Sequence, residues 1–108
     1  MTTPTTTLGQ AIIAARKKKG ISQKDLAAAV QKEDGTGAIS PQYLNDIEHD
    51  RRSPTSDHLI REFAGALGVD EDYLFVLAGK IPEDLRLSAT DPANTAAAFR
   101  AFRRRLSK

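Results

Sequence analysis

The sequence predicts an all-α protein, and three features of its pattern support this. Apolar residues recur at spacings of three and four along most of the chain. Serine, aspartate or proline stands where these patterns begin, and glycine stands where several of them stop. No segment shows the apolar–polar alternation of a half-buried strand. A chain of 108 residues, 40% of them hydrophobic, can build one modest core, with or without an appendage.

Two helices are expected near the N-terminus. The first begins at Leu8 and stops at Gly20, after apolar residues at helical spacing. Ser22 and Asp25 then have the spacing of a capping box, in which each side chain satisfies a backbone N–H of the other residue. A second helix follows this box. The stretch 31–39 contains two glycines and no helical period, so we expect a loop there.

Three more helices are expected before the chain changes character near residue 80. Ser40 is a favourable N-cap and Pro41 suits the first helical position, so a third helix should run to about Glu48. A fourth helix ends at Gly68, and a fifth begins after Asp70. These helices alternate with short connections, as expected for a compact helical domain.

The expected third helix carries few apolar residues for a core helix. Leu44 and Ile47 can dock one narrow face of it, which leaves the opposite face polar. Arg51 and Arg52 follow this helix within an otherwise acidic stretch. Short polar side chains on a helix docked in this way can contact base edges in the major groove of DNA. The alternative is that these side chains are only solvated.

Several motifs in order resemble the Xre-type, lambda-repressor-like helix-turn-helix domain of bacterial and phage regulators. They are SQKDLA, SPQYLNDIE, RRSP, LIREFAGALGV and DEDYL. The resemblance covers residues 8–79 and implies a compact five-helix DNA-binding domain there. It also implies that the third helix is the recognition helix, which would explain its polar surface.

The resemblance and the side-chain chemistry together imply roles for individual residues. An amide can pair bidentately with adenine, and a carboxylate can accept from cytosine or exclude wrong bases. The expected base-reading residues are Gln42, Asn45, Asp46 and Pro41. The expected phosphate-contacting residues are Gln23, Ser40, Tyr43, Arg51 and Arg52, with core packing as the alternative for Tyr43. Relatives pair an arginine of the first helix with a glutamate that ends the third, which implies a structural ion pair between Arg16 and Glu48.

The loop over 31–39 departs from the family pattern, because helices two and three are usually joined by about three or four residues. We expect Ile39 to fill the core as the apolar turn residue of relatives does. The additional residues either form a solvated bulge or contact the DNA backbone through Lys32 and Thr36. Glu33 and Asp34 argue against close contact with phosphate.

The chain beyond residue 79 lies outside the resemblance. Residues 80–90 are expected to form a linker or a short helical turn. Residues 91–108 should form a last helix, whose apolar stripe includes Phe99, Phe102 and Leu106 and is surrounded by arginines. This stripe needs a partner surface, and we expect a homodimer. The alternatives are packing on the same chain, a protein partner, and arginine contacts to DNA phosphate.

Other classes of function are poorly supported. Residues 1–7 lack the features of a signal peptide and are expected to be a disordered leader. No apolar run reaches membrane-spanning length and the chain has no cysteine, which together favour the cytoplasm. The resemblance implies that this is the cytoplasm of a bacterial or phage system. His49 and His58 lack neighbours of metal-ligand spacing. We therefore expect no catalysis and no cofactor.

The sequence thus predicts a transcriptional regulator, specifically a repressor. It would bind double-stranded DNA at an inverted-repeat operator as a homodimer. A second hypothesis is an antitoxin-like or adaptor module that binds another protein through its C-terminal helix.

Overall fold

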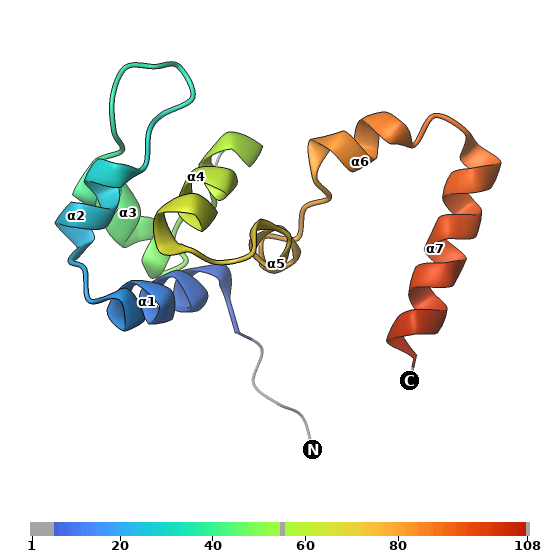
Figure 1. The fold of residues 1–108 in the computed structure, drawn as a ribbon, viewed down its shortest axis with the longest axis horizontal. Coiled ribbons are helices and arrows are strands. Elements are labelled where there is room, and N and C mark those ends of the chain that lie inside the picture. The colour runs from blue at the N-terminus through green and yellow to red at the C-terminus, as the bar shows by residue number, and fades with distance from the viewer. Residues whose placement is uncertain (1–5, 55, 108) are drawn as a thin grey trace.

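The computed structural model describes residues 6–54 and 56–107, and besides helices the regular structure in these residues is one isolated β-bridge. Figure 1 shows the order of its helices. They are α1 (Leu8–Lys19), α2 (Gln23–Ala29), α3 (Pro41–Glu48), α4 (Asp57–Leu67), α5 (Glu71–Leu77), α6 (Glu83–Ser88) and α7 (Pro92–Leu106). The prediction of an all-α fold is confirmed.

Helices α1 to α5 form a packed body. Within it α1 packs against α3, α4 and α5, and α2 packs against α3 and α4. Its core includes the fully buried side chains of Ile12, Leu26, Leu44, Phe63 and Phe75. Ile39, the residue that ends the long loop, is also in this core and only 4% exposed. It fills the core as the sequence predicted.

The caps of the first two helices differ in part from the expected ones. Thr7 and Gln10 form a reciprocal capping box at the start of α1, so Thr7 belongs to the fold and not to the predicted leader. The rest of that prediction falls on residues 1–5, which lie outside the described residues, and on the exposed Thr6. Ser22 accepts a hydrogen bond from the Asp25 N–H, but only this half of the predicted box is formed at α2.

The start of α1 lies directly against the end of α3. A Cβ atom at Gly9 would stand 2.4 Å from the Glu48 carbonyl oxygen and 2.5 Å from that of Ile47, so only glycine fits. Asp50 follows α3 in a left-handed conformation with φ of 59°, a region that aspartate tolerates better than most residues. Its carboxylate accepts from the Thr7 hydroxyl at 2.6 Å and the Gly9 N–H at 3.1 Å. These contacts fix α3 relative to α1.

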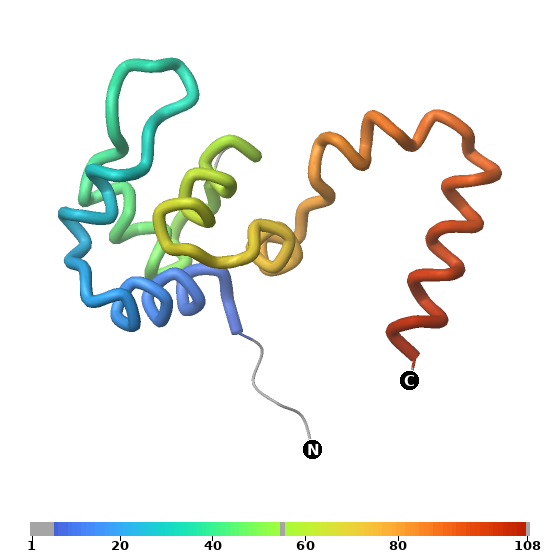
Figure 2. The backbone as a smooth tube through the Cα atoms, in the orientation of Figure 1, coloured from blue at the N-terminus to red at the C-terminus, as the bar shows by residue number. Residues whose placement is uncertain are grey.

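Helices α6 and α7, residues 80–107, form an arm that leaves the body. Residues 80–90 contain α6 within the predicted linker, and neither α6 nor α7 has a buried residue. The backbone trace turns at the far end of α6, and α7 stands apart from α1 to α4 (Figure 2). The Cα radius of gyration is 15.9 Å, whereas a compact domain of about 100 residues has about 13 Å. The alternative that the last helix packs on its own domain is therefore not realised.

Asp57, at the start of α4, attaches the arm to the body. Its side chain is 9% exposed, and its carboxylate lies 3.1 Å from Lys80 Nζ and 3.4 Å from Arg86 Nη2. It also accepts from the Glu83 N–H at 3.0 Å. Burial acts to raise the pKa of Asp57, but the hydrogen bonds from Lys80 and Glu83 and the charges of Lys80 and Arg86 outweigh it and hold this pKa below its usual value. The carboxylate therefore stays ionised at the junction.

Candidate nucleic-acid interface

Helix α3 presents one polar face to solvent. Ser40 caps the helix by accepting from the Tyr43 N–H at 3.0 Å, and Pro41 occupies its first position. Leu44 and Ile47 are buried, whereas Gln42 is exposed and Asn45 and Asp46 are partly exposed. Eight residues span about 12 Å, the width of the major groove of B-DNA. His49, just beyond α3, is exposed and continues the polar face. Its position four residues after Asn45 and seven after Gln42, at helical spacing, is the sequence feature that indicates this.

A buried polar cluster supports the opposite side of α3. The Glu48 side chain is 1% exposed, and its carboxylate lies 2.7 Å from Arg16 Nε and 3.2 Å from Arg16 Nη2. This bidentate contact joins α1 to the end of α3 and brings together the two residues that the resemblance paired. Such a pair fixes geometry because removal of either partner would leave a buried charge.

Gln23, the first residue of α2, joins the same cluster. Its amide nitrogen donates to Glu48 Oε1 at 2.7 Å and to Asn45 Oδ1 at 3.1 Å. Gln23 thus orients Asn45, one of the predicted base-reading residues. Its own contact with a DNA phosphate stays a prediction.

Asp46 is the centre of a second, more exposed cluster. Its carboxylate oxygen Oδ1 accepts from Gln42 Nε2 at 3.1 Å and lies 3.0 Å from Arg51 Nη2, while Oδ2 lies 3.6 Å from Arg52 Nε. The side chains of Arg51 and Arg52 remain 53% and 61% exposed. The Asp46 carboxylate therefore contacts both a predicted base-reading residue, Gln42, and the two arginines predicted to contact phosphate. The sequence did not suggest this, because the arginines follow Asp46 by five and six residues, outside helical spacing.

Tyr43 packs against the core and presents little polar surface. Its hydroxyl is buried without a hydrogen-bond partner among the described residues, and the Arg52 guanidinium lies 5.8 Å from the centre of its ring. This arrangement favours the packing alternative. A phosphate contact by Tyr43 would require its side chain to move.

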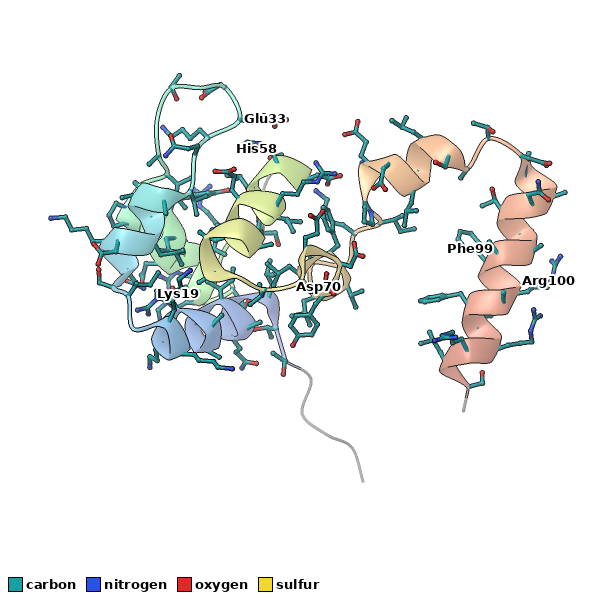
Figure 3. The ribbon with its side chains drawn as sticks, viewed as in Figure 1. Lys19, Glu33, His58, Asp70, Phe99 and Arg100 are labelled. Carbon is teal, nitrogen blue, oxygen red and sulfur yellow. The ribbon has the colours of Figure 1, made fainter. Side chains whose placement is uncertain are left out.

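The long loop forms a short hairpin whose base is held against α4 and whose tip projects from the body (Figure 1). Gln31 and Ala38 form an antiparallel bridge, and the Lys32 N–H donates to the Gly37 carbonyl at 2.8 Å. Glu62 and His58 of α4 contact the Gln31 backbone at 2.9 and 3.0 Å. Figure 3 places Glu33 and His58 where the loop lies over the start of α4. Lys32 and Thr36 are exposed, and their contact with DNA stays a prediction.

The predicted partner contacts are far from α3 and lie on the arm. Phe99, Phe102 and Leu106 are 49%, 60% and 67% exposed. In Figure 3, Phe99 lies on the side of α7 that faces the rest of the chain, and Arg100 on the other side. Among the described residues no group of acidic, histidine or cysteine side chains is placed to hold a metal ion. None of the described helices combines the length and apolar character needed to cross a bilayer.

Comparison with known proteins gives one match. A family model described as helix-turn-helix matches residues 12–74. This stretch begins within α1, includes the long loop and the polar face of α3, and ends at Leu74 in α5. No curated protein and no solved structure matches the chain. The arm lies outside the matched residues.

Proposed function

Because the chain belongs to the Xre-type, lambda-repressor-like helix-turn-helix family, whose domain binds DNA, we propose that it is a sequence-specific repressor. It binds an inverted-repeat operator as a homodimer, with α3 in the major groove of each half-site. It acts in the cytoplasm of a bacterial or phage system and needs neither a cofactor nor a catalytic step.

The observation that carries this proposal is the contrast between the two sides of α3. The inner side is fixed by Leu44, Ile47 and the ion pair of Glu48 with Arg16. The outer side offers the amides of Gln42 and Asn45. A rigid helix with amide groups on its outer side can discriminate base pairs, because each bidentate contact contributes about 1–3 kcal/mol of discrimination.

The roles of the remaining residues follow from their positions. Pro41 can contact a thymine methyl group, and Ser40 lies where the helix N-terminus favours a phosphate. Arg51 and Arg52 contact phosphates on the strand beside α3, and this contact competes with Asp46 for their guanidinium groups. Asp46 then becomes available to a cytosine amine or rejects other bases.

Two copies are needed because one α3 spans only a few base pairs. A two-fold dimer presents two such helices about 34 Å apart on one side of the duplex. Phe99, Phe102 and Leu106 supply apolar surface for this association. The dimer would therefore be held by the arm while the body contacts DNA.

Selection of bound fragments from a pool of random duplexes tests this function. It should be done near physiological salt, because low salt strengthens non-specific binding. We expect an enriched inverted repeat bound by two chains, with the mass of the complex measured alongside. Weak, salt-sensitive binding without enrichment would contradict sequence-specific regulation.

The exposed aromatics of the arm also favour a second candidate function. An antitoxin-like or adaptor module would grip another protein with Phe99, Phe102 and the arginines beside them. Copurification of a second protein that is lost in Phe99→Ala would favour this function. A stable homodimer with high operator affinity would disfavour it.

A further inference from the structure

The arm carries an apolar groove between α6 and α7. The groove has a volume of about 610 Å³, and its apolar lining includes Ile81, Leu85, Ala98, Phe99 and Phe102. These side chains are not covered by the body, since Ile81 and Leu85 are 50% and 56% exposed. These apolar side chains gather in one groove, where contact with an apolar partner surface is favoured over contact with water.

The groove cannot be filled by the body of the same chain in this arrangement. The first turn of α6 is tied to α4 through the contacts of Asp57 with Lys80, Glu83 and Arg86. Arg86 also donates to the Ile81 carbonyl, which stiffens the entry to α6. The chain therefore leaves the body in a fixed direction and places α7 beyond the far end of α6, as Figure 1 shows.

The charges of α6 and α7 indicate which segment fills the groove. Helix α7 carries Arg100, Arg103, Arg104 and Arg105 without an acidic residue, and none of these arginines forms an ion pair with the described part of its own chain. Glu83 and Asp84 form an acidic segment at the start of α6, and their side chains form no ion pair among the described residues. The one base of α6, Arg86, is held by Asp57. Helix α7 of a second copy thus offers an apolar face beside bases that can pair with this acidic segment.

We propose that two copies exchange their arms, so that α7 of each copy packs into the groove between α6 and α7 of the other. Phe99 and Phe102 then contact the partner's Ile81 and Leu85, and the arginines beside them lie near the partner's acidic segment. A helix of 15 residues is about 22 Å long and about 10 Å wide, which suits a groove between two helices. The exchange is two-fold and closed, so each groove is filled once.

This inference rests on the homodimer of the proposed function and names its interface. It differs from a simple pairing of two α7 helices, which would bring their arginines together without acidic residues between them. Like charges in such an interface are unfavourable, and the exchange offsets this by also placing the acidic segment of α6 of one copy beside α7 of the other.

Cross-linking tests the exchange directly, because the chain has no cysteine and introduced thiols are unique. Ser88 and Ala98 both line the groove, from α6 and α7 respectively. Chains with Ser88→Cys and chains with Ala98→Cys are mixed without DNA and treated with a short bis-maleimide. We expect a product of dimer mass that joins position 88 of one chain to position 98 of the other. Phe99→Ala with Phe102→Ala in both chains should abolish it.

A matched control uses Ala14→Cys, an exposed position on α1 far from the arm, which should give no product with Ala98→Cys. Three results would overturn the exchange. They are a monomeric mass without cross-links, a product from Ala98→Cys chains alone with none that joins 88 to 98, and a chain carrying both Ser88→Cys and Ala98→Cys that cross-links only within itself.

Failure of DNA recognition would be visible separately. If the 88–98 product forms but no duplex is enriched from the random pool, the exchange stands and the operator proposal fails. If an inverted repeat is enriched but only Ala98→Cys chains cross-link to one another, the regulator stands and the exchange fails.

Discussion

The body and the arm of this protein differ in how far their large apolar side chains are buried. In the body the large side chains of Phe63 and Phe75 are covered by neighbouring helices and are 0% and 1% exposed. In the arm Phe99 and Phe102 are 49% and 60% exposed. Of the four phenylalanines, two are thus buried in the core of the body and two are exposed on the arm.

Polar groups show the same contrast. The body places Glu48 in a buried pair with Arg16, so its charge is satisfied within the chain. The arginines of α7 have no carboxylate partner in the described part of the chain. The buried charge of the body is therefore paired within the chain, whereas the charges of α7 are available to a partner molecule. Four experiments test this distinction, and three of them compare matched residues.

The largest effect is expected from truncating aromatic residues. Phe63→Ala should lower the free energy of unfolding by about 3–5 kcal/mol, because it removes a fully buried ring and leaves a cavity. Phe102→Ala should change the stability of the dilute monomer by about 0.5 kcal/mol or less. Chemical denaturation monitored by circular dichroism measures both. Equal losses would mean that α7 packs on its own body in solution.

The next effect concerns glycine in two helices of the body. Gly9→Ala should destabilise the protein by about 1–3 kcal/mol, because the added methyl group meets the carbonyl oxygens at the end of α3. Gly65→Ala on α4 is the control, since nothing lies within 4 Å of the added atom. This control should be neutral or stabilising by up to about 1 kcal/mol. Thermal or chemical denaturation of the two variants decides whether α1 and α3 are truly in contact.

Arginine substitutions separate the two regions by their role in DNA binding. Arg51→Ala should weaken binding to all duplexes and lower the magnitude of the slope of log K against log salt by about one for each half-site of the dimer. Arg100→Ala on α7 should leave this slope unchanged, because that residue is proposed to serve the association of chains. Fluorescence anisotropy over a series of salt concentrations gives both slopes. A change in slope for Arg100→Ala would assign the arm to phosphate contact.

The smallest effect is expected at the junction of the two regions, where the pKa of Asp57 is lowered from 3.8. Its stabilising contribution should be fully present above about pH 4 and should fade as the pH falls through the lowered native pKa. Asp57→Asn should therefore be less stable than the natural chain at neutral pH, with a difference that shrinks in acid. Denaturation at several pH values measures this difference. A difference independent of pH would remove Asp57 as an ionised anchor.

The sequence predicted the parts of the fold that depend on local signals. The αL glycines at Gly20 and Gly68 and the N-caps Ser40 and Asp70 appear where expected, because each is defined by a few neighbouring residues. A buried Ile39 also followed from its place in the family pattern.

What the sequence could not predict depends on contacts between residues far apart in the chain. The contacts of Asp50 with Thr7 and Gly9, and that of Asp57 with Glu83, join residues that are 26 to 43 positions apart. The carboxylate of Asp46 was predicted to face DNA, and its contacts with Arg51 and Arg52 depend on how the turn after α3 is folded. No periodicity indicates such contacts.

Contact of α3 with base pairs can be tested by one selection experiment. Selection from a random duplex pool is carried out in parallel with the natural chain and with Gln42→Ala. We expect the variant to keep the inverted repeat but to lose its preference at one symmetric base position, at a cost of about 1–3 kcal/mol. Identical enriched sequences for the two chains, or an equal loss of affinity for operator and scrambled DNA, would contradict it.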